Sequence, residues 1–304
     1  MDLSVIIVSH STNVLTSDCI ISVIKNTKGI KYEIIVIDNA SNDGSITMLK
    51  RYKSKIANFS LILNKKNFGF GKANNQGMKN AKGRYLLLLN SDTKINSNVL
   101  GEMISWMDKN SDIGISSCAL LNISGSYQGT GGYFPTLPRV FSWMILQDIP
   151  FMDKIIKPFH PMKEKSGFKN EKFYRIEKEL DWLTGAFLLI KREVYEEVGG
   201  FDEDYFMYTE ETDLCYRAKM AQWKIYYNPK WSIVHLGGAS GTKELAVLKE
   251  FEGVKLFYKK HFPLWQYPIL RLIIKLGSLG RAILFGLLEG RDSAKIYLKA
   301  FYYA

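Results

Sequence analysis

Two side chains that are far apart in the sequence have the chemistry of ligands for a divalent cation. Asp92 ends the triplet Asn90-Ser91-Asp92, directly after the apolar run Tyr85–Leu89. His235 ends another apolar run and precedes the pair Gly237-Gly238. Hard divalent cations bind carboxylate oxygens, and a neutral imidazole nitrogen can complete such a site. A diphosphate bound in a partly dry cleft needs a cation of this kind to neutralise its charge. Taken alone, Asp92 fits a turn or a helix cap equally well, and a lone histidine is more often structural.

A second carboxylate, Asp38, has the chemistry to recognise a pyrimidine base. It closes the apolar run Tyr32–Ile37. A carboxylate at this position can accept a hydrogen bond from the N3–H of uracil or thymine. Aspartate is also common in turns that start a helix, so the position alone leaves both roles open.

The loop Asn67–Asn75 leads from an apolar run into a predicted helix. Glycines at 69 and 71 allow the backbone to approach a ligand, and the amino end of a helix favours anions. Asn74 stands where a dinucleotide-binding fingerprint has its third glycine, and the loop follows the third strand rather than the first. The glycine spacing therefore argues against a dinucleotide oxidoreductase and is a weak indication of a diphosphate contact.

The acidic run Glu210-Glu211-Thr212-Asp213 begins a predicted helix and is the candidate for acid–base chemistry. A carboxylate here can take a proton from an acceptor hydroxyl, or it can simply complement the helix dipole. Glu210 and Glu211 project roughly 100° apart on a helix, so they need not share a role. Asp213 has Arg217 four residues later, which predicts a structural ion pair.

An alternating α/β pattern positions these residues. Short apolar runs predict strands at residues 3–8, 32–37, 59–63, 85–89 and 113–121, with helices at 14–26, 45–52, 72–81 and 99–107. Fully apolar strands separated by helices predict a mainly parallel sheet with helices on both faces. Ligands of such sheets bind beyond the carboxyl ends of the strands, where Ser9, Asp38 and Asp92 fall.

The pattern is less regular after residue 121. Glycine, serine and proline predict loops and short helices over residues 122–180. A strand at 182–191, helices at 192–198 and 209–221, and two short strands at 224–227 and 232–235 follow. Between Phe262 and Leu288, one helical face carries Arg271, Lys275, Ser278 and Arg281, and the apolar residues lie elsewhere, which predicts an amphipathic helix.

Composition and charge restrict the class of protein. The chain is 46% hydrophobic and 23% charged, which excludes a disordered protein. Its net charge is +11, and from Gly253 onward nine Lys and Arg face two acidic residues, which predicts an anionic surface as partner rather than nucleic acid. The three cysteines are scattered and predict reduced, buried thiols. We expect no signal peptide, because no basic segment followed by a long apolar one opens the sequence. We also expect no membrane-spanning helix, because no apolar run reaches about 20 residues.

Eight motifs in series resemble the family-2 inverting glycosyltransferases with the GT-A fold, an α/β fold with a Rossmann-like sheet. The resemblance covers about residues 3–240 and rests on the segments Ser4–Ser9, Ile37–Ser41, Asn67–Asn74, Tyr85–Asp92, Asp181–Ala186, Gly200–Tyr208, Asp213–Arg217 and His235–Ser240. It implies that Asp38 reads the pyrimidine, that Asp92 and His235 bind the metal, and that Glu211 is the catalytic base. The family usually has aspartate at the position of Glu211.

The resemblance implies further site residues. The donor-binding positions would be Ser9, Asn67, Gly69, Lys72, Asn74 and Ser91. The acceptor and sugar pocket would contain Asp181, Trp182, Gly185, Ala186 and Glu210. The catalytic domain would end at residue 240 and would consist of a nucleotide-binding half (1–121), an irregular insertion (122–180) and an acceptor half (181–240). A basic amphipathic helical tail (241–304) would follow it.

The segment from Asp181 to Arg217 looks most like bacterial rhamnosyltransferases of surface-polysaccharide assembly. That likeness implies a Mn²⁺- or Mg²⁺-dependent transfer of L-rhamnose from dTDP-L-rhamnose to a lipid-linked saccharide. The enzyme would work in the cytoplasm on the inner face of the plasma membrane, with its basic tail at the membrane surface. The alternatives are another UDP- or dTDP-sugar as donor, a scaffold that has lost turnover, or a nucleotidyltransferase. The last would need a basic glycine-rich loop after the first strand, and residues 9–13 offer none.

Overall fold

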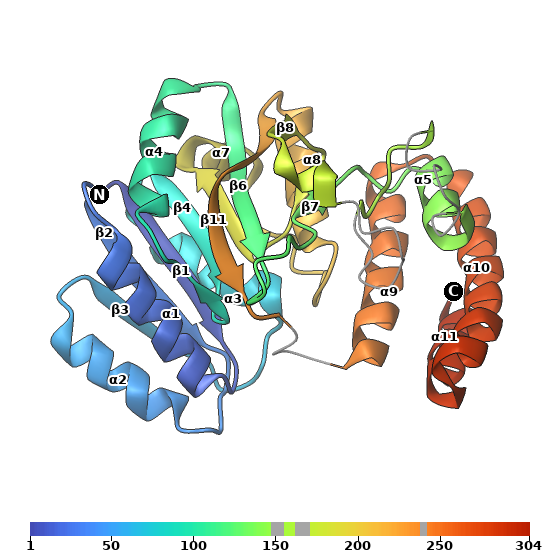
Figure 1. The fold of residues 1–304 in the computed structure, drawn as a ribbon, viewed down its shortest axis with the longest axis horizontal. Coiled ribbons are helices and arrows are strands. Elements are labelled where there is room, and N and C mark those ends of the chain that lie inside the picture. The colour runs from blue at the N-terminus through green and yellow to red at the C-terminus, as the bar shows by residue number, and fades with distance from the viewer. Residues whose placement is uncertain (147–154, 162–170, 238–241) are drawn as a thin grey trace. The chain divides into compact units, whose positions relative to one another are not determined.

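The computed structural model describes residues 1–146, 155–161, 171–237 and 242–304 (Figure 1). These residues form two compact units. The first contains Met1–Gly131, Glu171–Phe206 and Glu211–Ser240, and the second contains Gly132–Asn170, Met207–Glu210 and Gly241–Ala304. Gly238 and Ser240, which belong to the last of the eight motifs, lie outside the described residues.

The first unit holds the predicted α/β pattern. Its strands are β1 (Leu3–Ser9), β2 (Tyr32–Asp38), β3 (Phe59–Leu63), β4 (Tyr85–Asn90), β5 (Thr93–Lys94), β6 (Ile113–Leu121), β8 (Lys178–Glu179), β9 (Trp182–Leu183), β10 (Phe187–Lys191) and β11 (Lys224–His235). Its helices are α1 (Asn13–Asn26), α2 (Ser45–Lys55), α3 (Phe70–Asn80), α4 (Val99–Lys109), η2 (Glu171–Arg175) and α7 (Arg192–Val198), and α8 (Glu210–Met220) continues into it.

Within the described part of the chain, nine strands form one mixed sheet. Its order is β3-β2-β1-β4-β10-β6-β11-β5, and β8 pairs with β11. The first four strands are parallel, as the sequence predicts, whereas β10 runs antiparallel to both of its neighbours. Ser9 pairs with Asp38, and Val8 pairs with Asn90. The carboxyl ends of β2, β1 and β4 therefore meet at one edge of the sheet.

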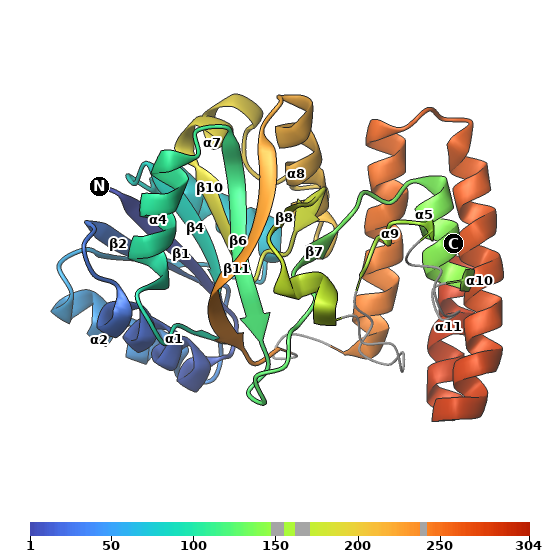
Figure 2. The same ribbon diagram turned by 45° about the horizontal axis from the view of Figure 1, so that its top comes forward.

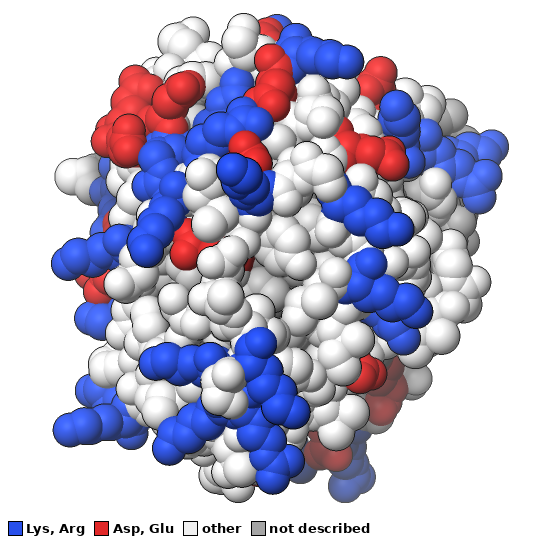
Figure 3. All heavy atoms as spheres, turned by 90° about the vertical axis from the view of Figure 1, so that its left-hand side faces the viewer, with Lys and Arg blue, Asp and Glu red and all other residues white. Residues whose placement is uncertain are grey.

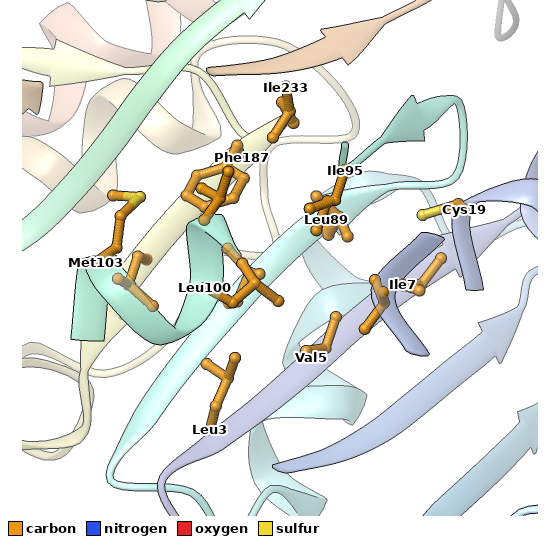
Figure 4. Close-up of a cluster of buried hydrophobic side chains, with 14 of the residues drawn as sticks. Leu3, Val5, Ile7, Cys19, Leu89, Ile95, Leu100, Met103, Phe187 and Ile233 are labelled. Carbon is orange, nitrogen blue, oxygen red and sulfur yellow. The ribbon is translucent and has the colours of Figure 1, made fainter. Parts of the chain in front are cut away.

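Side chains alternate between the two faces of this sheet along each strand, and helices pack on both faces. Val5 and Ile7 point to the same side as Cys19 of α1 and Leu100 of α4, in one buried apolar cluster (Figure 4). Ile6 points the other way, where a side chain on Gly77 of α3 would come within 2.4 Å of it. Glycine in this helix thus permits close packing, and the sheet has helices on both faces, as predicted.

Two predicted strand assignments are wrong. The apolar segment 182–191 is not one strand, because it breaks into β9 and β10 at Thr184-Gly185-Ala186. Conversely, the two strands predicted around Asn228-Pro229 are the single strand β11, whose register against β6 shifts between Asn228 and Ser232. A proline is tolerated in a strand at such an irregularity.

The first unit carries a cationic surface that the sequence reading did not single out. No Asp or Glu occurs between Gly44 and Asn90. Six exposed cations, Lys50, Arg51, Lys53, Lys55, Lys65 and Lys66, lie on α2 and after β3. Lys and Arg gather in the lower part of the face shown in Figure 3, on the side of the molecule where Figure 1 places α2. This surface, called the α2 cationic surface below, is a second candidate for contact with anions.

The second unit is helical in its described part. It contains α5 (Leu137–Phe141), a π-helical turn η1 (Ser142–Leu146), α9 (Lys243–His261), α10 (Gln266–Glu289) and α11 (Arg291–Tyr303). Helices α10 and α11 lie side by side and are joined at Gly290, whose φ is +94° (Figure 2). None of the helices in the described segments is long and apolar enough to cross a bilayer.

Helix α10 is amphipathic, as predicted, but its polar face is directed inward. Ser278 and Arg281 are buried, and Arg281 donates to the Trp143 carbonyl of η1. Arg271 donates its Nε to the Ala304 oxygen at 2.7 Å. Most of the basic face therefore packs on its own unit instead of forming a free polybasic surface, although Arg271 stays exposed. Periodicity locates the two faces of a helix, but only packing decides which of them is covered.

All three cysteines are buried and free, in agreement with the sequence reading. Burial raises the pKa of the Cys19 thiol to about 12. The thiolate, which is the reactive form, is therefore scarce near neutral pH.

Candidate active site at the sheet edge

The structure brings Asp92 and His235 together through a short antiparallel pairing. His235 at the end of β11 pairs with Thr93 of β5, and the Leu236 amide donates to the Asp92 carbonyl at 2.9 Å. His235 Nε2 lies 3.3 Å from Asp92 Oδ1. Both side chains are mostly buried, at 16% and 8% exposure. Residues 143 positions apart thus face each other at one edge of the sheet.

Gln128 fixes the orientation of His235, and no sequence pattern pointed to it. Its Nε2 donates to the His235 carbonyl and to Asn122 Oδ1, both at 2.7 Å. Because the amide nitrogen faces two acceptors, Gln128 Oε1 is the acceptor for His235 Nδ1, at 2.7 Å. The imidazole proton of the neutral ring is therefore on Nδ1, and the lone pair of Nε2 points toward Asp92.

This arrangement fits a divalent cation. In the neutral ring, the Nε2 lone pair and the Asp92 carboxylate are two acceptors that face each other, which a cation between them would turn into a favourable contact. Asn90 Nδ2 is 3.5 Å from the same Nε2. No group of three His, Cys, Asp or Glu side chains suited to a metal occurs in the described ranges. The protein thus offers two ligands, and a bound diphosphate could supply further oxygens.

Replacing Gln128 with leucine should weaken Mn²⁺ binding by roughly 10- to 100-fold, because the ring loses the partner that sets its tautomer and orientation. Electron paramagnetic resonance titration of Mn²⁺ measures this directly. Ser124→Ala, in the same loop and exposed, is the matched control and should keep wild-type affinity. An unchanged affinity in the Gln128→Leu protein, with the fold intact by circular dichroism, would remove Gln128 from the site.

Asp38 lies at the same edge and has an unused acceptor. The residue is fully buried, and its Oδ1 accepts the Ser41 amide at 3.0 Å. Its Oδ2 has no hydrogen-bond partner in the described structure. A buried acceptor without a partner costs about 1–3 kcal/mol, and a ring N–H donor would remove that cost. The geometry is therefore consistent with the predicted contact to a pyrimidine.

Asn39 joins the tips of three strands, a role that its position beside Asp38 could have indicated. Its amide donates to the Ser9 carbonyl at 2.7 Å, and its Oδ1 accepts from Asn64 Nδ2 and from the Phe68 amide, both at 3.1 Å. Its Nδ2 donates to Asn67 Oδ1 at 2.8 Å. Through its backbone amide and its side chain, one buried residue thus holds the ends of β1, β2 and β3 in a fixed arrangement.

A cluster of hydroxyl groups connects the first strand to the Asn90-Ser91-Asp92 turn. Ser9 Oγ lies 2.9 Å from Thr16 Oγ1, and Thr12 Oγ1 lies 3.1 Å from Ser91 Oγ. All four side chains are buried. Two predicted donor-binding residues, Ser9 and Ser91, therefore hydrogen-bond within the protein, where they fix the turn before Asp92.

The predicted loop from Asn67 to Asn74 also makes contacts within the protein. Gly69 has φ +83°, and a Cβ there would lie 2.3 Å from the Phe206 carbonyl, so the glycine is needed for packing. Lys72 is paired with Glu203 at 2.8 Å, and Asn74 donates to the Phe70 carbonyl at 3.0 Å. Contacts of this loop with a nucleotide stay a prediction.

The segment Asp181–Ala186 lies against both the Asn67–Asn74 loop and the Asn90-Ser91-Asp92 turn. A Cβ on Gly185 would be 2.7 Å from the Phe70 ring, and the Ala186 carbonyl accepts the Asn90 amide at 3.0 Å. Trp182 is buried, and Asp181 pairs with Lys219 at 2.9 Å. The segment predicted to line the sugar and acceptor pocket is thus beside Asn90.

Helix α8 places Glu211 on the side of this segment. Cys215, one turn further along the same face, is buried, and its thiol hydrogen-bonds to the backbone of Leu183. Because residues four apart share a helical face, Glu211 is directed toward the same segment. The predicted ion pair is confirmed, since Arg217 binds Asp213 Oδ2 at 2.8 Å. Glu210 is buried at 2% exposure.

Unusual backbone conformations concentrate at these segments. Five non-glycine residues in the described ranges have positive φ, and four of them are Ser11, Ala40, Tyr208 and Thr209. The first two follow β1 and β2, and the last two precede Glu210-Glu211. Left-handed backbone at ordinary residues costs of order 1–3 kcal/mol and is often kept where a site requires it.

Comparison with known proteins gives one family. The model of glycosyl transferase family 2 matches residues 4–199. The N-acetylglucosaminyl-diphospho-decaprenol L-rhamnosyltransferase of Mycobacterium tuberculosis is 26% identical over 215 residues, which are 66% of this chain and 66% of the relative. The rhamnosyltransferase WbbL of Escherichia coli is 25% identical over 211 residues, which are 67% of this chain and 72% of the relative. The chain thus matches about two thirds of the length of these relatives.

Solved structures agree on the fold. A mannosyltransferase from Pyrobaculum calidifontis in complex with GDP-Man and Mn²⁺ has a TM-score of 0.56 at 16% identity, covering 99% of this chain and 75% of that one. GalNAc-T7 with UDP, GalNAc and Mn²⁺ has a TM-score of 0.60 at 18% identity, covering 84% and 48%. The fold is therefore the GT-A fold predicted from the sequence.

Proposed function

The chain belongs to glycosyl transferase family 2, and we propose that it transfers L-rhamnose from dTDP-L-rhamnose to a lipid-linked saccharide, with inversion at the anomeric carbon and a divalent cation as cofactor. Two relatives named as L-rhamnosyl- and rhamnosyltransferases support the sugar. One of them is named for a diphospho-decaprenol substrate, which supports a lipid-linked acceptor. Work on such an acceptor would bring the enzyme to the inner face of the plasma membrane.

A single observation carries this proposal. Asp92 and His235 face each other at 3.3 Å, and Gln128 directs the Nε2 lone pair of His235 toward the Asp92 carboxylate. Such a pair of acceptors is suited to a cation. Both structural neighbours were solved with Mn²⁺ and a nucleotide or nucleotide sugar, which supports the same cofactor here.

In the proposed reaction Asp92 and His235 would hold the cation, whose positive charge would offset the charge that develops on the leaving diphosphate. Asp38 accepts the N3–H of thymine through its free Oδ2 and so positions the base. Both contacts orient the donor, with its anomeric carbon toward the segment Asp181–Ala186.

Glu211 takes the proton from the acceptor hydroxyl as the oxygen attacks the anomeric carbon. The new glycosidic C–O bond forms while the bond from the anomeric carbon to the diphosphate oxygen breaks on the opposite face. Nucleoside diphosphate leaves with the bonding electrons, and the configuration inverts. A β-linked donor therefore gives an α-L-rhamnoside.

A panel of sugar nucleotides tests the proposal. The protein is incubated with Mn²⁺, extracted lipid-linked acceptor, and dTDP-L-rhamnose, UDP-glucose, UDP-N-acetylglucosamine or GDP-mannose in turn, and products are identified by mass spectrometry. We expect addition of one deoxyhexose, from dTDP-L-rhamnose alone. Transfer from a UDP- or GDP-sugar instead would overturn the donor assignment. Absence of transfer and of donor hydrolysis with every donor would indicate a scaffold.

A further inference from the structure

The outward face of α10 is apolar along its whole length. Its exposed side chains recur every three or four residues at Trp265, just before the helix, and at Ile269, Leu272, Leu276, Leu279, Ile283 and Leu287. Exposure reaches 57% for Leu272, 62% for Ile283 and 82% for Leu287. The stripe is roughly 33 Å long at the rise of an α-helix. These residues are called the α10 apolar face below.

The inward packing of the opposite face fixes this orientation. Arg281 donates to the Trp143 carbonyl, and a Cβ on Gly277 would lie 2.6 Å from Met144, so α10 packs closely on η1 through that side. Rotation of the helix to cover its leucines would break these contacts. The α10 apolar face is therefore a stable surface feature, and soluble monomers rarely expose so long a stripe of leucine and isoleucine.

Charge and aromatic residues indicate what covers this face. Between Gly253 and Leu288 the chain has six Lys and Arg and no Asp or Glu. Arg271 is exposed on α10, and exposed aromatic side chains, Trp265, Tyr302 and Tyr303, occur at its start and at the end of α11. Leucine-rich faces bordered by cations and aromatic residues are typical of helices that lie in the interface of an anionic bilayer.

A second copy of the chain fits this face less well. Pairs of helices usually place complementary charges beside the apolar seam. Here the exposed Leu284 and Leu288 widen the seam, and α10 carries no carboxylate before Glu289. Two such helices would bring only cations close to each other, whereas anionic headgroups would complement them.

We propose that the α10 apolar face inserts into the headgroup region of an anionic bilayer, with α10 parallel to the membrane surface. The contact is made by leucine and isoleucine, and the cations act around it. The proposed function places the enzyme at a membrane, and the α10 apolar face is the surface that would contact it; in that sense the inference rests on the proposed function.

Vesicle flotation of the full chain tests the proposal. Vesicles of phosphatidylcholine and phosphatidylglycerol in equal parts should carry the wild-type protein to the top of a density gradient. The double variant Leu276→Glu with Ile283→Glu should bind these vesicles at least roughly tenfold more weakly, because two apolar side chains lose their place in the interface. Both positions are exposed, so unchanged circular dichroism and thermal unfolding are expected. Ile123→Glu, at an 82% exposed position of the first unit, is the matched control and should float normally.

Three outcomes would overturn the inference. The first is unchanged flotation of the double variant, and the second is loss of flotation only when Lys50, Arg51 and Lys53 of the α2 cationic surface become glutamine. The third is a wild-type protein that does not bind vesicles but forms dimers in sedimentation, with the dimers lost in the double variant. Donor hydrolysis in vesicle-free buffer separates this inference from the proposed function. Flotation without any hydrolysis or transfer would reject the function and retain the docking face.

Discussion

An Asp92→Ala variant is expected to lose Mn²⁺-dependent binding of dTDP, by roughly 100-fold or more. Loss of a partner that merely orients a ligand costs 10- to 100-fold in metal affinity, and loss of a ligand costs at least as much. Of the two proposed protein ligands, only His235 would remain. Its Nε2 lies 3.5 Å from Asn90 Nδ2. The thermal shift produced by dTDP with Mn²⁺ should disappear.

Asp92→Asn and Asp38→Asn distinguish the parts of the site. Asp92→Asn keeps the shape of the side chain but removes its charge, so it should lose most of the Mn²⁺ effect. Asp38→Asn should weaken dTDP both with and without Mn²⁺, since Asp38 is assigned to the base. A wild-type thermal shift in Asp92→Ala would show that the cation binds elsewhere.

The Glu211→Gln variant should bind dTDP and Mn²⁺ normally but transfer sugar roughly 10²- to 10⁴-fold more slowly, the usual contribution of a general base. The amide keeps the size of the side chain and cannot take a proton. Turnover under saturating donor and acceptor measures the effect, and the thermal shift verifies donor binding.

Two further variants give this result its meaning. Glu211→Asp restores the residue that the family usually has, and its activity compared with wild type measures how the one-bond change in length affects the reaction. Glu210→Gln serves as the matched neighbour, although its burial makes a check of folding necessary. Full activity of Glu211→Gln, with loss of activity in a folded Glu210→Gln protein, would move the base to Glu210.

The sequence predicted the first half of the fold well because its strands are fully apolar and short. Strands β1 to β4 and helices α1 to α4 begin and end within a few residues of the predicted bounds. Polar residues that end such strands necessarily meet at one sheet edge, so Asp38 and the turn at Asp92 could be placed there from the pattern. His235 entered through the resemblance and its flexible neighbours, and the β5–β11 pairing supplied the contact.

The failures have a common physical cause, since each depends on contacts between distant residues. An apolar run cannot show that Gly185, in the break between β9 and β10, packs against the Phe70 ring. Pro229 looked like a strand end but lies at a register shift within β11. Gln128 sits in an irregular loop, where no spacing marks a partner of His235 107 residues away.

The direction of α10 shows the same limit. Its periodicity separated a basic face from an apolar face correctly. Hydrophobicity alone favours burial of the leucines, whereas the packing of Arg281 and Gly277 on η1 buries the opposite side. Only the structure could therefore move the proposed membrane contact from a polybasic surface to an apolar face.

The central claim is that Asp92 and His235 jointly bind the cation that neutralises the donor diphosphate. An anomalous-difference map from crystals grown with Mn²⁺ and dTDP measures this directly. We expect a manganese peak within bonding distance of Asp92 Oδ1 and His235 Nε2, with diphosphate oxygens completing the coordination. A manganese peak that contacts neither side chain, with dTDP bound elsewhere, would contradict it.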